Sequence, residues 1–170
     1  MDNPRYTAEG FGVDFSASVL ATILAESIRA GRRETGGVLL GGYSEGLDVA
    51  SVVEALGPPR DSRAGATWFH RGVAGINAAL QDRWKRRTPT YYLGEWHFHP
   101  HASATPSSAD LRQMREIASS GRYRCPEPIL AVLGGDPEGL WTLNVVIVRR
   151  EQGVLPLQLV ANPEKSHADP

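Results

Sequence analysis

Two histidines, two residues apart, close a stretch of strand-forming residues, and this feature restricts the fold of the chain more than any other. The stretch Thr90–His99 is rich in aromatic residues and predicts a β-strand. Side chains of a strand alternate between its two faces, so His97 and His99 should point the same way and Phe98 the opposite way. Pro100 cannot donate a hydrogen bond to a neighbouring strand, so the strand should end there.

A second polar pair, Ser107 and Asp110, follows at the beginning of a helical pattern. Apolar residues recur about one turn apart over Ser108–Ser120, which predicts a helix with Asp110 in its first turn. The end of a strand and the start of a helix can meet at one point, which would bring His97, His99 and Asp110 together. Two imidazoles and one carboxylate, with a fourth position open, are the ligands of a catalytic zinc ion. The spacing therefore predicts a zinc hydrolase.

Each half of this pattern also has a structural interpretation. Ser107 and Asp110 fit a capping box, in which the serine caps the helix and the acid reaches back. Taken alone, His97 and His99 could be a half-exposed pair on a strand. A capping serine can still point its hydroxyl at a metal-bound oxygen, so capping and function are compatible at Ser107.

An acidic residue precedes a short apolar strand earlier in the chain. Glu34 opens the run ETGG, which leads into the apolar segment Val38–Leu40. Hydrolysis by zinc needs a base for the water proton and an acid for the leaving amine, and one carboxylate can serve as both. Glu34 is a candidate for this role. A solvated residue at a helix–strand corner is the alternative that its local sequence leaves open.

Together these residues resemble the JAMM motif of the JAB/MPN metalloproteases. The resemblance covers roughly Val13 to Val160. Its five motif positions are Glu34, His97, His99, Ser107 and Asp110, with Glu34 in the ETGG context and Pro100 directly after His99. Phe98 departs from the serine or threonine that members often carry, but it should face away from the metal. The run Gly94-Glu95-Trp96 looks most like the small stand-alone bacterial members. Those members are associated with ubiquitin-like conjugation systems, including antiphage defence.

The resemblance implies a fold and a chemistry. The fold would be α/β, a mixed sheet flanked by helices with the cytidine-deaminase-like architecture of JAB/MPN domains. Residues 1–160 would form one metalloprotease domain. His97, His99 and Asp110 would hold one Zn²⁺ per chain with a catalytic water. Glu34 would move the proton, and Ser107 would donate a hydrogen bond to the developing oxyanion.

It also implies a substrate. The activity would be that of an isopeptidase or peptidase that removes or matures a ubiquitin-like modifier at its C-terminus, with the modifier and its conjugates as partners. The segment Thr67–Arg87 would contact the modifier. One alternative is a peptidase that processes a sulfur-carrier protein in cysteine synthesis, with identical zinc chemistry. The other is a metal-free MPN scaffold, which would need none of the motif residues.

Composition and cysteine content exclude other functions. The chain has 18 Lys and Arg against 19 Asp and Glu, a net charge of −1, which argues against nucleic-acid or membrane-surface binding. No apolar run is long enough to cross a bilayer, and the N-terminus lacks a signal-peptide pattern. Cys125 is the single cysteine, so no internal disulfide can form, and we interpret it as structural or incidental. We expect a cytoplasmic protein.

Periodicity and turn residues outline the remaining elements. The expected elements are a helix from about Phe15 to Ile28 with Asp14 or Ser16 as N-cap and Gly31 as its stop, a hairpin of Val38–Gly42 and Val49–Leu56, a helix from Trp68 or Phe69 to Arg87, the strands Ile129–Gly134, Leu140–Arg149 and Val154–Val160, and a frayed polar tail, Ala161–Pro170.

Two further residues near the histidines need an interpretation. Glu95 shares the strand parity of His97 and His99, so it could orient an imidazole, or it could be a buried or edge polar residue, and both stay open. His101 follows Pro100 and should be a loop residue rather than a fourth ligand, because a catalytic zinc keeps that position open.

Overall fold

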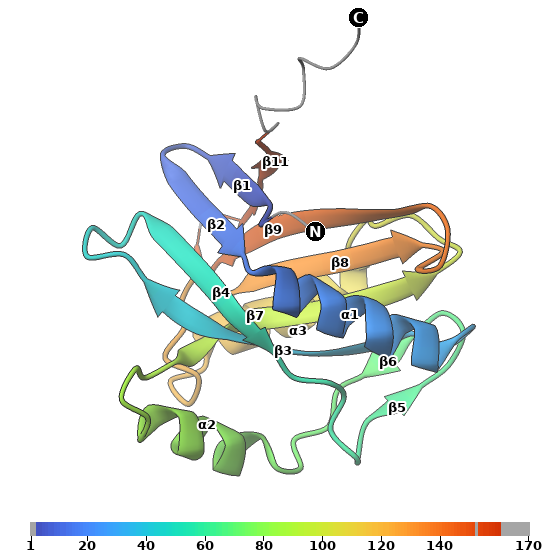
Figure 1. Cartoon of the computed structure of the whole chain (residues 1–170), viewed down its shortest axis with the longest axis horizontal. Helices are drawn as coiled ribbons and strands as arrows, with labels where there is room; N and C mark the ends of the chain where they lie inside the picture. Colours follow the sequence, from blue (N-terminus) through green and yellow to red (C-terminus); the bar gives the residue numbers. More distant parts are fainter. Residues whose placement is uncertain (1–2, 152, 161–170) are drawn as a thin grey trace, which may run out of the picture.

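The computed structural model describes residues 3–151 and 153–160, and its centre is one mixed nine-stranded sheet (Figure 1). The strand order is β10-β9-β8-β7-β3-β4-β2-β1-β11. The strands are β1 (Arg5–Ala8), β2 (Phe11–Phe15), β3 (Thr35–Tyr43), β4 (Val49–Ala55), β7 (Tyr91–Pro100), β8 (Ile129–Gly135), β9 (Trp141–Arg149), β10 (Gly153–Pro156) and β11 (Gln158–Leu159). A separate two-stranded sheet consists of β5 (Arg63–Ala64) and β6 (Phe69–His70).

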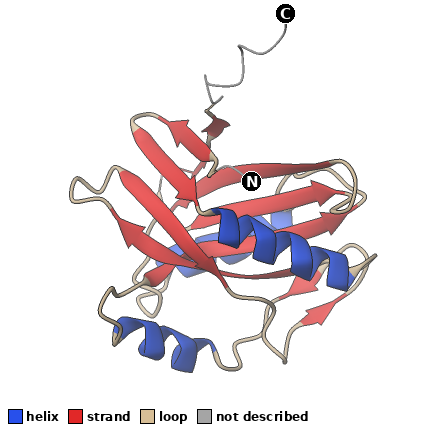
Figure 2. Cartoon of the chain, viewed as in Figure 1, coloured by secondary structure: helices blue, strands red, loops and turns tan. Residues whose placement is uncertain are grey.

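Helices cover both faces of the large sheet (Figure 2). The described helices are α1 (Ala17–Ala30), α2 (Ile76–Trp84) and α3 (Ser108–Ser119). α1 packs its buried side into one hydrophobic cluster and α3 packs into another on the opposite face. The pairs β2–β4 and β7–β8 are parallel and the other pairs are antiparallel. This architecture confirms the expected α/β class with a mixed sheet flanked by helices. None of the helices among the described residues is long and apolar enough to span a membrane.

The first helix forms as its sequence predicts. Ser16 is the N-cap, with an extended backbone, and Val19, Leu20 and Ile23 are buried on one side. Gly31 ends the helix with a φ of 62°, which an L residue rarely adopts. The hairpin of β3 and β4 is also confirmed.

β7 lies between β3 and β8 near the middle of the sheet, and its two faces differ. Trp96 and Phe98 belong to the cluster that α1 covers, whereas Glu95, His97 and His99 are buried polar residues that face Gln113 or Asp110 of α3. The register with β3 shifts between Leu39 and Leu40. Because of this bulge, side chains of β7 that precede it, such as Tyr92, lie on the opposite face from the one that simple alternation would give them.

Several expected boundaries were wrong. The segment predicted as one helix from Trp68 or Phe69 begins its helix only at Ile76, because Phe69 and His70 form β6 and Gly75 adopts a φ of 81°. Val73 and Trp84, which fall within the predicted helix, are 66% and 61% exposed and lie outside the core.

The two ends of the chain also differ from expectation. The predicted strand Val154–Val160 is divided into β10 and β11, and the N-terminal strands β1 and β2 were not predicted. β11 is added to the sheet beside β1, so these pairs join segments far apart in sequence. The tail expected to fray, residues 161–170, lies outside the described residues.

Candidate functional site

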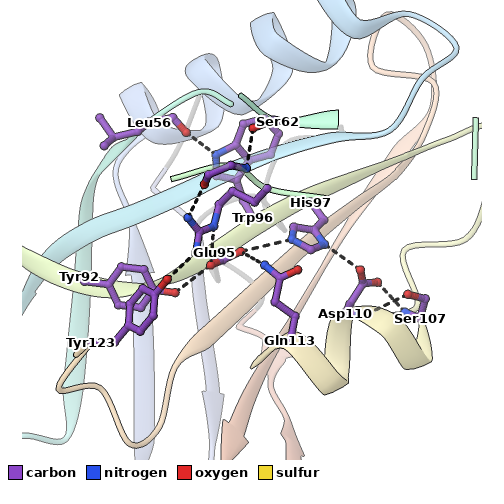
Figure 3. A network of polar contacts seen from close by, with 12 residues as sticks. Leu56, Ser62, Tyr92, Glu95, Trp96, His97, Ser107, Asp110, Gln113 and Tyr123 are labelled. Carbon is purple, nitrogen blue, oxygen red and sulfur yellow. Dashed lines mark hydrogen bonds and ion pairs between the residues drawn. The ribbon is translucent and has the colours of Figure 1, made fainter. Parts of the chain in front are cut away.

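The end of β7 and the start of α3 meet, as the spacing of the polar residues predicts. His97 Nδ1 lies 2.9 Å from Asp110 Oδ1, and His99 Nε2 lies 3.3 Å from Asp110 Oδ2. All three side chains are buried. One buried carboxylate therefore faces both imidazoles, and Figure 3 shows its contact with His97.

The capping box exists and fixes the Asp110 carboxylate. The Ser107 backbone N–H donates to Asp110 Oδ2 at 2.7 Å, and the Asp110 N–H donates to Ser107 Oγ at 3.1 Å. Asp110 is thus held by its own helix end while it faces the histidines. The cap uses the Ser107 hydroxyl only as an acceptor, so its proton remains available for another partner.

Two glycines on the strands beside β7 allow close packing around the histidines. Gly36 pairs with His97 across β3 and β7, and a Cβ at Gly36 would lie 2.9 Å from His97 Cδ2 and 2.8 Å from Phe69 Cε1. Phe69 itself meets the His97 ring edge-on, with centroids 5.5 Å apart. Gly134 pairs with His99 across β7 and β8, and a Cβ there would lie 2.4 Å from the Ala104 backbone nitrogen. Both positions therefore require glycine because of close packing.

Glu34 lies directly before β3, and its backbone N–H donates to the Gly65 carbonyl at 2.8 Å. Its carboxyl interacts electrostatically with His99, Asp110 and His97. Burial raises its pKa most, the Asp110 charge adds to this, and the two histidines oppose it. A carboxyl with a raised pKa suits a group that both accepts and donates a proton near neutral pH.

The charges of the site stabilise one another. Burial alone would lower the pKa of His97, but contacts with Asp110 and Glu95 raise it to about 9. Burial would raise the pKa of Asp110, but its contacts with His97 and His99 hold it well below its usual range. The raised pKa of each imidazole and the lowered pKa of Asp110 have the same cause, the attraction between opposite charges that are buried together.

The donor set fits a zinc ion. Within residues 3–151 and 153–160, no three His, Cys, Asp or Glu side chains are already arranged as a metal-binding cluster. Two tetrahedral ligands at about 2.05 Å from zinc would lie about 3.3 Å apart, close to the separations of Asp110 from the two imidazoles. His99 Nε2 is buried without a hydrogen-bond partner and faces this carboxylate. These separations and this nitrogen without a partner are what a zinc ion bound among the three side chains would require.

A buried polar network surrounds Glu95 behind His97 (Figure 3). Arg71 Nε donates to Glu95 Oε1 at 2.7 Å, the Tyr92 hydroxyl donates to the same oxygen at 3.1 Å, and Gln113 Nε2 donates to Oε2 at 2.7 Å. His97 Nε2 lies 3.6 Å from Glu95 Oε2. Strand parity pointed to Glu95, but no sequence signal indicated Arg71, which is far away in the chain.

Two other candidates lie apart from this cluster. His101 is exposed, has a φ of 54°, and donates its backbone N–H to Gly135, so it is the expected loop residue. Burial raises the pKa of the Cys125 thiol to about 12, which makes the side chain a poor nucleophile.

Comparisons with known proteins place this chain in a family. Residues 16–148 match the model of the prokaryotic homologs of the JAB domain. The chain belongs to this family. All five motif positions, from Glu34 to Asp110, lie within the matched residues.

Two curated relatives and one solved structure are also similar to this chain. A CD-NTase/cGAS isopeptidase from Enterobacter hormaechei is 44% identical over 91% of this chain and 84% of that protein. A probable metalloprotease from Sinorhizobium fredii is 30% identical over 71% of this chain and 74% of that protein. A solution structure of a Desulfitobacterium hafniense protein shares the fold, with a TM-score of 0.63 and 19% identity over 84% of this chain and 87% of that one.

Proposed function

We propose that this JAB-family protein is a zinc-dependent isopeptidase that removes a ubiquitin-like modifier from a conjugated target. The observation that carries the proposal is the convergence of His97, His99 and Asp110, with a buried imidazole nitrogen that has no hydrogen-bond partner. Glu34 within electrostatic range of all three supports it, as does the metalloprotease name of one relative.

Each motif residue has one task in this proposal. His97, His99 and Asp110 would hold the zinc ion, which lowers the pKa of a bound water toward ~7 when it is present. Glu34 would accept a proton on its carboxylate and deliver it to the leaving amine. Ser107 would use the proton left free by the helix cap to donate a hydrogen bond to the developing oxyanion.

We place the substrate tail beside the β5–β6 hairpin. This hairpin is tied to the site because Gly65 accepts from the Glu34 N–H and Phe69 packs against His97. A short two-stranded sheet has unpaired edges, and an extended peptide can add to such an edge by backbone hydrogen bonds. Strand addition there would lay the C-terminal tail of the modifier toward the metal ligands.

The target class is proposed from the Enterobacter hormaechei relative. That protein is named a CD-NTase/cGAS isopeptidase, and it is 44% identical to this chain. We therefore propose a CD-NTase joined to a modifier as the conjugate that this protein cleaves. Processing of a sulfur-carrier protein would use the same residues and differ only in substrate.

The test measures metal content and cleavage together. The purified chain should carry about one zinc, and it should cleave a modifier joined through its C-terminal carboxylate to a target lysine. Parallel substrates would be a modifier fusion, a sulfur-carrier fusion and a short unrelated peptide. Full activity in a strong chelator would contradict the zinc proposal. Preference for the sulfur carrier would assign the alternative substrate, and rapid cleavage of the unrelated peptide would reject a specific deconjugase.

A further inference from the structure

The imidazole of His97 lies between two carboxylates that play different parts. Its Nδ1 faces Asp110 at 2.9 Å, within the proposed metal site. Its Nε2 faces Glu95 Oε2 at 3.6 Å, on the side away from Asp110, and has no hydrogen-bond partner within bonding distance (Figure 3). The ring therefore presents one nitrogen to the site and the other to Glu95.

His99 has the same arrangement with a different acceptor. Its Nε2 faces Asp110 at 3.3 Å, and its Nδ1 lies 3.3 Å from the Ser103 carbonyl oxygen. Each imidazole thus turns one nitrogen to Asp110 and the other to an oxygen acceptor. A metal-binding histidine usually donates its second ring N–H to a carboxylate or a backbone carbonyl, which fixes the tautomer and the ring orientation.

The Glu95 carboxylate is held in place from three separate parts of the chain. Arg71 comes from the segment between β6 and α2, Tyr92 from β7 before the bulge, and Gln113 from α3. Glu95 is fully buried and Arg71 nearly so. A buried ion pair is costly to desolvate and is often replaceable by apolar residues. Stability alone therefore does not explain why the Arg71–Glu95 pair is buried here.

We propose that Glu95 is a positioning residue for His97. Its carboxylate accepts a hydrogen bond from the Nε2–H of His97, which leaves Nδ1 unprotonated and free to bind the metal. Arg71 holds the Glu95 carboxylate in place. The inference rests on the proposed function in one respect, because it takes the bound ion to be zinc. The alternative is that Glu95 serves solely as the counter-ion of Arg71. In that case the tautomer of His97 and the zinc affinity would not depend on it.

The tautomer of His97 tests the inference in the unaltered, full-length protein. Nitrogen-15 NMR of the zinc-loaded chain should show His97 protonated at Nε2 and unprotonated at Nδ1. A proton on Nδ1, with the metal on Nε2, would overturn the inference. A protein that takes up no zinc would overturn both this inference and the proposed function. A protein with the expected tautomer that cleaves no modifier would contradict only the proposed function.

Two variants separate positioning from network stability. Glu95→Gln should weaken zinc binding roughly 10–100-fold in competition with a chelator. Tyr92→Phe removes one hydrogen bond to the same carboxylate without touching the oxygen that faces His97, so its zinc affinity should stay within about threefold of the parent. Equal zinc affinity of the parent and Glu95→Gln, or equal losses in both variants, would overturn the inference. If Glu95→Gln does not fold, the tautomer in the parent protein decides.

Discussion

The two faces of β7 are equally buried but are stabilised in different ways. Trp96 and Phe98 on one face pack into the apolar cluster under α1, where burial of hydrocarbon surface favours folding. Glu95, His97 and His99 on the other face are polar, and burial of such groups is costly unless partners satisfy them. One strand therefore contributes to the core on one side, and on the other side it carries the residues of the proposed metal site. Substitutions on the two faces should separate these roles.

The largest expected effect is on the polar face, at a metal ligand. His99→Ala should remove zinc and reduce turnover to background, because two remaining ligands do not make a catalytic zinc site. Metal analysis of the purified variant, together with the conjugate-cleavage assay, checks this. Stoichiometric zinc with normal turnover would exclude His99 from the metal centre.

Glu34 should separate metal binding from proton transfer. Glu34→Gln keeps the side-chain shape but cannot accept the proton, so kcat should fall by roughly 10²–10⁴-fold. Zinc content should be that of the parent, since Glu34 is not a proposed ligand. Glu34→Asp is the matched control, because it keeps the carboxylate and should recover part of the rate. Normal turnover in Glu34→Gln would leave Glu34 as a solvated residue.

Ser107 should show both its structural and its chemical role. Ser107→Ala should lower kcat by roughly 10²–10³-fold as the loss of an oxyanion donor. It should also cost ~1 kcal/mol of folding free energy as the loss of a helix cap. Ser107→Thr keeps both the acceptor and the donor and should restore stability and rate together. A change in melting temperature alone would show that Ser107 only caps the helix.

On the apolar face, a comparable truncation should affect stability and spare chemistry. Phe98→Ala should lower the free energy of unfolding by about 3–5 kcal/mol, because it leaves a cavity in the core. Denaturant titration measures this loss. At a temperature where the variant is folded, zinc content and kcat per folded molecule should match the parent within about threefold. Loss of zinc from the folded variant would show that the two faces are coupled.

The smallest effect should come from the exposed end of α2. Arg86→Glu combined with Arg87→Glu should raise KM for a modifier conjugate a few-fold if this surface contacts the modifier. Arg83 should be left unaltered, since it donates to Glu54 and ties α2 to β4. Zinc content should not change. Equal KM values for parent and variant would remove this surface from the recognition site.

The local pattern of the sequence predicted much of the fold and of the site. Alternation along the strand placed His97 and His99 on one face, and helical spacing placed Asp110 in the first turn of α3. These are short-range properties, since they depend on the two-residue and 3.6-residue periods of the backbone. The local hairpin of β1 and β2 escaped prediction, and its place in the sheet beside β11 and β4 is set by partners distant in the chain.

Residue types and local spacing were enough to identify the candidate zinc ligands and to predict that two of them share a strand face. The groups that surround and orient these ligands could be identified only from the folded arrangement. The bulge at Leu39 and Leu40 turns Tyr92 to the side of Glu95, against simple alternation. Arg71 reaches Glu95 only because the segment after β6 folds back over the site. Such contacts join residues far apart in the chain, and the close packing that selects them exists only in the folded protein.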